Sequence, residues 1–339
     1  MSIKILQPGF WTTIQDLGRY GSQKFGVIVG GAMDALAVRI ANLLVGNDER
    51  EATIEVTMFG LEMEFLDDHL IAVTGGDLDA RLDGEKLPTW RPVLVRKNQV
   101  LKFNAPISGA RAYIAFSGGI QVPEVMGSKS TYIQANIGGY DGRQLQENDV
   151  ICFGEKTEIG KLFMEQLEEM DSHYEWCVNY GSFYSFKKEQ TIRVLQGSEF
   201  DWFDEDSKHA FTNEAYKISL NSNRMGYQLE GKKLSLRKEA ELLSEGVTYG
   251  TIQVPSGGIP IILMAERQTT GGYPKIAQVV SVDLPRLAQS QPGNTINFKF
   301  ISLEEAEQLL LQQMRDLELL KTGIRFKVDE FRGNTHEAE

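Results

Sequence analysis

The chain has 339 residues, of which 42% are hydrophobic and 24% charged, and its net charge is −12. This length suffices for about two domains of roughly 150 residues, each with its own core. The acidic balance argues against a nucleic-acid partner, which needs a dense basic face, and no apolar run approaches the ~20 residues of a membrane span. The N-terminus also lacks a signal-type apolar block, so we expect a cytoplasmic protein with neither nucleic acid nor membrane as partner.

Cysteine and histidine usage narrows the chemistry. Cys152 and Cys177 lie far apart without a CxxC motif, which predicts buried, reduced thiols. The histidines are His69, His173, His209 and His336, and no two have metal-ligand spacing. A zinc hydrolase of the HExxH type is therefore excluded and a Ser-His-Asp mechanism is disfavoured. We expect no metal, and chemistry based on carboxylates, arginine, lysine and backbone dipoles.

Short segments of the first half recur in the same order in the second half. Residues 3–7 recur at 192–196, residues 53–57 at 251–255, and Gly75-Gly76 at Gly271-Gly272. Ordered repeats at similar offsets indicate a duplication. We place the boundary near residue 185, after an acidic stretch at 155–174 that is expected to be an irregular linker. The predicted domains are residues 1–185 and 186–339.

The predicted elements are mostly strands. Short apolar runs at 71–73, 93–95, 112–116 and 259–265 are bounded by turn residues, as all-β domains require. One helix is expected over residues 35–45, capped by Asp34 and ended by Gly46. A second begins at the capping box 302–305 and is expected to stop at Gly323. Its apolar positions 303, 306, 309, 310, 314, 317 and 320 form one face.

Polar loops carry the candidate chemistry in the first half. Asp16 and Arg19 leave a strand in a glycine-punctuated loop, where an ion pair and a ligand role are equally open. Residues 30–34 enter a helix N-terminus, which favours an anion, but Asp34 would repel one. The segment 127–131, Gly-Ser-Lys-Ser-Thr, lacks the order of a P-loop; it can hold an anion or form a simple turn. Downstream, Arg143 offers a guanidinium suited to a carboxylate.

The second half contains a denser set of polar residues. Residues 221–227 form a polar turn with Arg224 and Tyr227. Gln253 and the run 269–274 bracket the apolar run 259–265, which leads into Glu266-Arg267-Gln268. Two threonines before two glycines place hydroxyls beside bare backbone, which suits an oxyanion or carboxylate. A glycine-rich hairpin turn is the alternative.

Taken together, these segments resemble the allophanate hydrolase subunit 2 family, which includes KipA and the C subunit of 5-oxoprolinase. The resemblance spans residue 3 to about 300 and rests on residues 8–19, 31–34, 39–42, 127–131, 138–143, 223–227, 253–255 and 269–274. Departures from the family pattern are Gly197-Ser198 for Gly-Pro, Glu266 for Asp, Lys129 for Arg and Gln228 for Arg. The last two replace a guanidinium by a point charge or by an amide, which weakens the inference that this copy holds the family's ligand in the usual way.

The resemblance implies a mainly β fold, a tandem of two cyclophilin-like β-barrel domains with a few short helices and a C-terminal helix. It also implies a subunit of an ATP-dependent 5-oxoprolinase, which opens 5-oxoproline (pyroglutamate) to glutamate. The expected partners are a KipI-like subunit 1 and a TIM-barrel subunit. ATP is expected in the assembled enzyme, although this chain has no nucleotide motif.

Two alternatives remain open. The first is a biotin-dependent carboxyltransferase subunit of the urea carboxylase type; no Ala-Met-Lys-Met is present, so the chain itself does not carry biotin. The second is a non-catalytic, KipA-type regulator that binds a KipI-like kinase inhibitor.

We expect the second copy and the segment between the copies to carry the site. Arg224 and the loop 269–272 are expected to bind an anion or oxyanion, and Asp16 or Glu266 to carry or orient a proton. The candidate catalytic residues are Asp16, Arg224, Glu266 and Thr270. The candidate substrate-binding residues are Arg19, Lys129, Ser130, Thr131, Arg143, Tyr227, Gln253, Thr269, Gly271, Gly272 and Tyr273.

Overall fold

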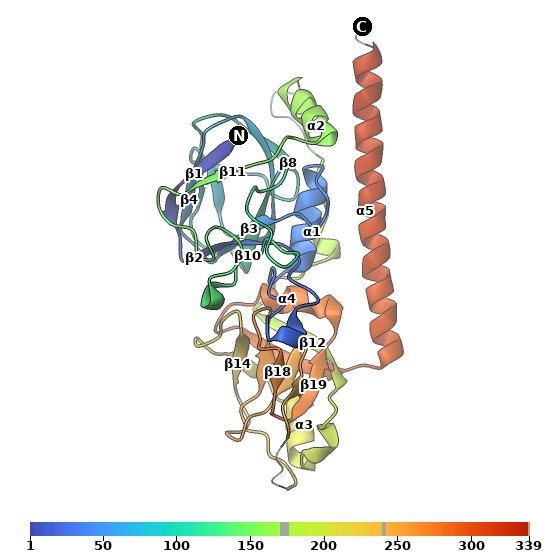
Figure 1. The fold of residues 1–339 in the computed structure, drawn as a ribbon. Helices are drawn as coiled ribbons and strands as arrows, with labels where there is room; N and C mark the ends of the chain where they lie inside the picture. The colour runs from blue at the N-terminus through green and yellow to red at the C-terminus, as the bar shows by residue number, and fades with distance from the viewer. Residues whose placement is uncertain (170–175, 239–241, 338–339) are drawn as a thin grey trace. The chain divides into compact units, whose positions relative to one another are not determined.

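The computed structural model describes residues 1–169, 176–238 and 242–337. The chain divides into two units (Figure 1). Unit 1 consists of residues 1–18, 34–184 and 314–339, and unit 2 of residues 19–33 and 185–313. No helix in the described ranges is both long and apolar enough to cross a membrane.

Unit 1 contains two antiparallel sheets around one core. The first has the order β11-β1-β4-β9-β6-β7 and the second the order β2-β3-β10-β5-β8. The strands of the first sheet are β1 (Ser2–Pro8), β4 (Leu61–Phe65), β6 (Ala80–Leu82), β7 (Glu85–Lys86), β9 (Val100–Phe103) and β11 (Val150–Cys152). The strands of the second are β2 (Trp11–Gln15), β3 (Thr53–Thr57), β5 (His69–Asp77), β8 (Pro92–Val95) and β10 (Ser108–Phe116). Side chains such as Ile3, Ile54 and Phe116 fill the core of the unit.

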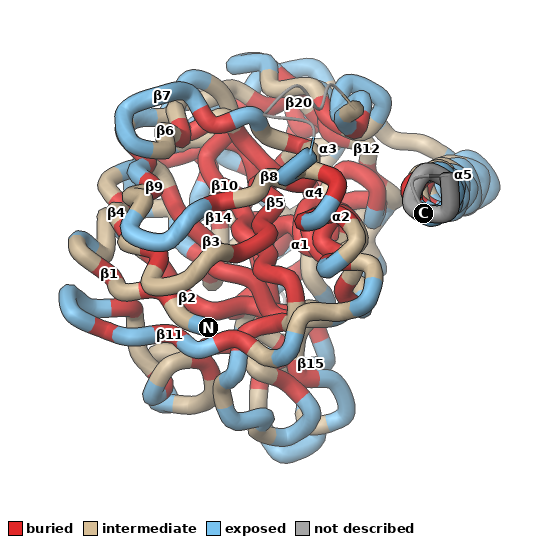
Figure 2. Tube along the Cα trace, turned by 90° about the horizontal axis from the view of Figure 1, so that it is seen from above, coloured by how far each residue is buried: buried red, intermediate tan, exposed pale blue. Residues whose placement is uncertain are grey.

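Helix α1 (Ala35–Leu44) covers the second sheet, packing against β5 and β10, and Figure 2 shows that these elements are buried. Both expected end signals are confirmed. The Asp34 carboxylate accepts a hydrogen bond from the Ala37 amide at 3.0 Å, and Gly46 adopts a left-handed conformation with φ 75°. Only Gly lacks the Cβ that makes this conformation costly. The Tyr184 hydroxyl holds the same Asp34 carboxylate at 2.8 Å.

The acidic stretch at 155–174 differs from the expected irregular linker. Helix α2 (Glu158–Glu169) occupies most of it, because Phe163 and Met164 lie on one face and are buried in unit 1. The remainder of that stretch, from residue 170, lies outside the described residues.

Unit 2 is built around a closed barrel with the order β12-β19-β16-β17-β14-β13-β20. The strands are β12 (Glu189–Gln196), β13 (Tyr216–Ile218), β14 (Gly226–Glu230), β16 (Thr251–Gln253), β17 (Ile261–Leu263), β19 (Lys275–Val279) and β20 (Thr295–Phe300). Helix α3 (Glu205–Asn213) closes one side, where Phe211 stacks on Phe298 with ring centroids 4.5 Å apart. A separate ribbon joins β15 (Glu245–Gly246) to β18 (Thr270–Gly271), and α4 (Leu284–Ala288) precedes β20. The short 3-10 helices of unit 2 are η1 (Gln23–Phe25), η4 (Phe200–Trp202) and η5 (Ser281–Asp283), and those of unit 1 are η2 (Ile133–Ala135) and η3 (Tyr180–Ser182).

The expected strands are confirmed. The runs at 71–73, 93–95 and 112–116 lie within β5, β8 and β10, and the run at 259–265 contains the shorter β17. The first two repeated segment pairs also fall on strands, on β1 and β12 and on β3 and β16. The mainly β class is therefore confirmed; the closed ring occurs in unit 2, whereas the strands of unit 1 form two sheets.

The C-terminal helix α5 (Leu303–Glu337) begins as expected, because the Ser302 hydroxyl accepts a hydrogen bond from the Glu305 amide at 3.1 Å. Its expected end at Gly323 is wrong. Ile324, Val328 and Phe331 lie on one helical face and are buried, and the Phe163 ring meets Phe331 edge-on at 5.4 Å. Burying these side chains outweighs the cost of about 1 kcal/mol for one helical glycine.

Most of the apolar positions expected on one face of α5 are not buried in this chain. Leu303, Leu310 and Met314 are 57%, 39% and 54% exposed, whereas Leu317 is buried.

The prediction for the cysteines is only partly right: Cys152 and Cys177 are free, but both are exposed rather than buried. In β11 the inward position belongs to Ile151, so the neighbouring Cys152 points outward.

Candidate functional site

Asp16 follows β2 and forms the centre of a hydrogen-bonded loop in unit 1. Its carboxylate accepts hydrogen bonds from the Ser128 hydroxyl at 2.7 Å, from the Lys129 amide at 2.6 Å and from the Ser130 hydroxyl. It also accepts one from the Gly18 amide at 2.8 Å. The donors of segment 127–131 are therefore directed at a carboxylate of the chain itself.

The other two side chains of this segment also have partners within unit 1. The Lys129 ammonium lies 2.8 Å from the Glu51 carboxylate. The Thr131 hydroxyl donates to the Ile14 carbonyl oxygen at 2.9 Å and is buried. In this arrangement the segment fixes a loop onto β2.

Arg143 binds a carboxylate, but one from its own unit. Its two terminal nitrogens donate to Asp149 at 2.7 and 2.8 Å, and its guanidinium carbon lies 5.0 Å from the centroid of the Tyr140 ring. The hydrogen bond to Asp149 raises the pKa of Arg143 above its usual value.

Arg224 and Glu266 meet in unit 2. The Arg224 Nε donates to the Glu266 carboxylate at 2.6 Å, and a terminal nitrogen donates to the Gly31 carbonyl oxygen at 2.6 Å. Their side chains are only 5% and 6% exposed. A buried pair of this kind holds the strand end after β17 and the segment 19–33 in place.

Two further candidates of unit 2 are buried away from its cavities. Arg19 has no exposed surface, and its backbone amide donates to the Val29 carbonyl oxygen at 2.7 Å. Tyr227 on β14 is 3% exposed and belongs to the barrel core. Thr269, in contrast, lies at the start of the ribbon, where its carbonyl oxygen accepts from the Val247 amide at 3.2 Å.

The remaining candidates come together at a cavity of 660 Å³ in unit 2, which we call the polar cavity. This volume lies within the range of about 300–1,000 Å³ that is typical of small-molecule sites. The cavity lies beside β14, β17 and the β15–β18 ribbon. Of the predicted residues, it is lined by Gln253, Thr270, Gly271, Gly272 and Tyr273.

Gln253 and Gly271 fit closely inside the polar cavity. The Gln253 amide nitrogen donates to the Tyr273 carbonyl oxygen at 3.3 Å, so its side chain lies across the glycine. A Cβ at position 271 would lie 2.5 Å from that amide nitrogen. The glycine thus gives the Gln253 amide its place in the cavity wall.

The polar cavity is also lined by residues that are not among the predicted site residues. They include Asn223, Gln228 and Arg267. Asn223 closes a turn, because its side-chain oxygen accepts a hydrogen bond from the Met225 amide at 2.8 Å. Arg267 lies inside the polar run Glu266-Arg267-Gln268, of which only Glu266 is among the predicted site residues. No signal in the sequence separates Arg267 from its neighbours, because the pairing of Glu266 with Arg224 is seen only in the fold.

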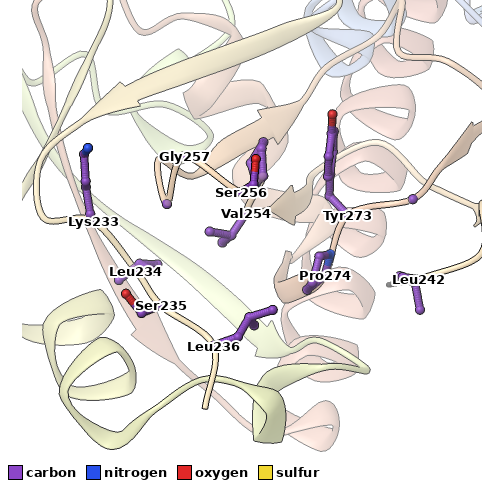
Figure 3. Close-up of a pocket in the computed structure, with 13 residues that line it drawn as sticks. Lys233, Leu234, Ser235, Leu236, Leu242, Val254, Ser256, Gly257, Tyr273 and Pro274 are labelled. Carbon is purple, nitrogen blue, oxygen red and sulfur yellow. The ribbon is translucent and has the colours of Figure 1, made fainter. Parts of the chain in front are cut away.

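A second cavity of 1060 Å³ adjoins the polar cavity and shares Gly272 and Tyr273 with it. Figure 3 shows Lys233 and Tyr273 on opposite sides of this cavity, with Ser256 and Gly257 between them. Leu234, Leu236 and Pro274 supply apolar wall. Tyr273 is 50% exposed and lines both cavities.

The polar cavity offers amide groups, hydroxyls and one guanidinium, and no carboxylate is among its described lining residues. Such a set can bind an anion or an amide and can stabilise a developing oxyanion. No group of three or more His, Cys, Asp or Glu side chains that could hold a metal ion occurs in the described residues.

Comparison with known proteins places this geometry in a family. The carboxyltransferase domain, subdomain A and B, matches residues 25–300. The chain is 40% identical to the C subunit of 5-oxoprolinase from Escherichia coli, over 94% of this chain and 97% of that protein. It is 38% identical to the C subunit of 5-oxoprolinase from Haemophilus influenzae, over 97% of this chain and 99% of that protein.

A solved structure agrees with the sequence comparison. The urea amidolyase of K. lactis superposes with a TM-score of 0.81 at 28% identity, covering 97% of this chain and 20% of that one. The predicted resemblance to the C subunit of 5-oxoprolinase is thus confirmed, together with a relationship to urea amidolyase. Since the family match covers most of the sequence, the chain belongs to the family of the carboxyltransferase domain, subdomain A and B.

Proposed function

We propose that this chain is the C subunit of an ATP-dependent 5-oxoprolinase, which opens the lactam of 5-oxoproline to give glutamate. The similarity to the C subunits of two 5-oxoprolinases, over nearly the full length of the chains compared, carries this proposal. A similarity confined to one domain would support the fold alone. We propose a KipI-like subunit 1 and a TIM-barrel subunit as partners in the cytoplasm, with ATP bound in the assembled enzyme.

The polar cavity is the part of the chain that suits this substrate best. Opening a lactam places negative charge on its carbonyl oxygen, which a positioned donor stabilises. Thr270 is exposed at the cavity, and its hydroxyl makes no hydrogen bond to another described residue. We therefore assign Thr270 to the lactam carbonyl, and Gln253 to the lactam amide.

The buried Arg224–Glu266 pair holds the segment that leads into the polar cavity. Glu266 directly precedes Arg267 of the cavity, and its backbone amide donates to the Arg224 carbonyl oxygen at 2.8 Å. We assign the two residues a positioning role. We also propose that the halves 1–185 and 186–339 are a tandem of cyclophilin-like domains, as the repeated strands indicate.

Reconstitution tests the proposed function. The chain is mixed with subunit 1 and the TIM-barrel subunit, and 5-oxoproline-dependent ATP hydrolysis and glutamate release are followed. We expect turnover in the complete mixture and its loss when any one protein is omitted. Turnover that is absent from the complete mixture, or that is unaffected by omitting this chain, would refute the proposal.

The match to a carboxyltransferase domain and the urea amidolyase fold favour one alternative, transfer of a carboxyl group from a separate biotin carrier. Adding carboxybiotin carrier and urea to the same mixture distinguishes the two activities. Urea carboxylation without 5-oxoproline turnover would replace the proposed function by this one. Binding of subunit 1 without either activity would favour the regulator.

A further inference from the structure

Arg267 differs from three other basic side chains considered for the site, each of which is paired with a carboxylate. Arg143 is paired with Asp149, Lys129 with Glu51, and Arg224 with Glu266. For Arg267, the described residues supply one hydrogen bond, from Nε to the Val247 carbonyl oxygen at a long 3.4 Å. Within residues 1–169, 176–238 and 242–337, no carboxylate forms an ion pair with it.

Because Arg267 is partly buried, the lack of a carboxylate partner among the described residues is energetically unfavourable. Its side chain is partly buried, and burial lowers the pKa of Arg267 from its usual value, against the smaller effect of Tyr249 and Tyr20. A guanidinium nevertheless stays charged at neutral pH. A charge that is partly removed from water without a counter-charge is unfavourable, and an anionic ligand removes that penalty.

The rest of the polar cavity is suited to such an anion. Its described lining contains no Asp or Glu, although the whole chain carries a net charge of −12. Neutral hydrogen-bonding residues line the same cavity as Arg267, and the nearest of them in sequence are Gln268 and Thr270. Asn223 and Gln253 add amides from two other segments. A planar amide in the ligand would find both donors and acceptors among these groups.

We propose that Arg267 anchors a carboxylate in the polar cavity, so that this cavity selects small amides that carry a carboxylate. A guanidinium holds a carboxylate through two parallel hydrogen bonds, which fixes orientation as well as position. The amides of Asn223 and Gln253 and the Thr270 hydroxyl then face the amide part of the ligand. This inference rests on the proposed function for its probe, 5-oxoproline, a lactam with one carboxylate.

The test compares Arg267→Gln with the wild-type chain in the reconstituted complex. We expect the KM for 5-oxoproline to rise about 100-fold, the worth of a charge-assisted bidentate pair, with a smaller change in kcat. Arg267→Lys, which keeps the charge but loses the fork, is expected to recover part of this loss. The wild-type complex should bind 5-oxoprolinamide, in which the carboxylate is replaced by a neutral amide, about 100-fold more weakly than 5-oxoproline.

A merely structural role for Arg267 would not produce this pattern. In the Arg267→Gln complex, the preference for 5-oxoproline over 5-oxoprolinamide should disappear. The matched control is Arg237→Gln, since Arg237 is 52% exposed, pairs with Glu205 and does not line the polar cavity. This variant should leave KM and the preference unchanged. An unchanged KM in Arg267→Gln, or a wild-type complex without the preference, would overturn the inference.

Failure of the proposed function can be distinguished from failure of the Arg267 anchor. If the wild-type complex does not turn over 5-oxoproline, the function fails, and titration of the full chain with 5-oxoproline still tests the anchor. Binding that is lost in Arg267→Gln and kept in Arg237→Gln supports the anchor. Equal binding by wild type and Arg267→Gln, or no binding by either, overturns it.

Discussion

Arg224 donates a hydrogen bond from Nε to the Glu266 carboxylate over 2.6 Å, and both side chains are almost fully buried. The pair joins the polar turn before β14 to the segment after β17. In this pair each charge neutralises the other. The next residue along the chain, Arg267, reaches the cavity instead.

Breaking this pair should destabilise unit 2. Arg224→Met leaves a buried carboxylate without its counter-charge, and we expect the free energy of unfolding to fall by about 3–5 kcal/mol. The double variant Arg224→Met/Glu266→Met should regain part of that loss, because no buried charge remains. Urea denaturation of the full chain measures both. Additive losses in the double variant would show that the two residues do not interact.

Gly271 should control the position of the Gln253 amide. In Gly271→Ala the new Cβ meets the end of the Gln253 side chain at 2.5 Å, and that flexible end moves away. Loss of one ligand hydrogen bond predicts a rise in KM for 5-oxoproline of about 2- to 10-fold, with little change in the melting temperature. Gly246→Ala on the paired strand β15 is the control, since a Cβ there meets nothing within 4 Å. Equal effects in both variants would contradict the assignment.

His69 should make the chain sensitive to acid. Its ring is 1% exposed beside Phe153, with ring centroids 4.7 Å apart. Burial, helped by the positive charge of Lys156 and opposed by the Ser117 backbone and by Asp67, lowers the pKa of His69 from 6.5 to about 4. The unfolded chain therefore binds this proton more readily than the folded chain does. The contribution of neutral His69 to the free energy of unfolding is therefore fully present above pH 6.5. It is lost as the pH falls toward 4, which lowers the free energy of unfolding by about 3 kcal/mol.

Denaturation of wild type and His69→Phe at pH 7, 5.5 and 4 measures this effect. The phenylalanine ring keeps most of the volume and cannot be protonated, so the loss of stability across this range should be smaller in the variant. The same loss in both proteins would show that His69 is not the group responsible.

Gly323 lies inside α5, where an alanine Cβ would meet nothing within 4 Å. Gly323→Ala should therefore stabilise the chain by about 0.5–1 kcal/mol, through higher helix propensity. Gly46→Ala is the opposite case, because φ is 75° and the Cβ would lie 2.8 Å from Ile159. Calorimetry should show a higher melting temperature for the first variant and a lower one for the second.

The contrast between these glycines shows what the sequence could predict. The ends of α1 follow from local hydrogen bonds and one backbone angle, so Asp34 and Gly46 were recognisable. The length of α5 depends on Phe331 packing against Phe163, a contact between residues far apart in the chain. A sequence pattern shows that Gly323 weakens a helix, but not that distant packing outweighs it.

The same limit applies to the candidate site. Gln253, Thr270 and Gly271 were found because their residue types and order are distinctive. The charged candidates were harder, since the partner of Arg224 is 42 residues away and that of Lys129 is 78 residues away. Arg267 differs from them by the lack of a carboxylate partner among the described residues, which only the fold reveals.

The most direct measurement is a crystal structure of the assembled enzyme grown with 5-oxoproline and without ATP. We expect the lactam to lie in the polar cavity of this chain, with its carboxylate hydrogen-bonded to the Arg267 guanidinium and its carbonyl oxygen near Thr270. A 5-oxoproline molecule bound only on another subunit, with the polar cavity filled by water, would contradict this expectation.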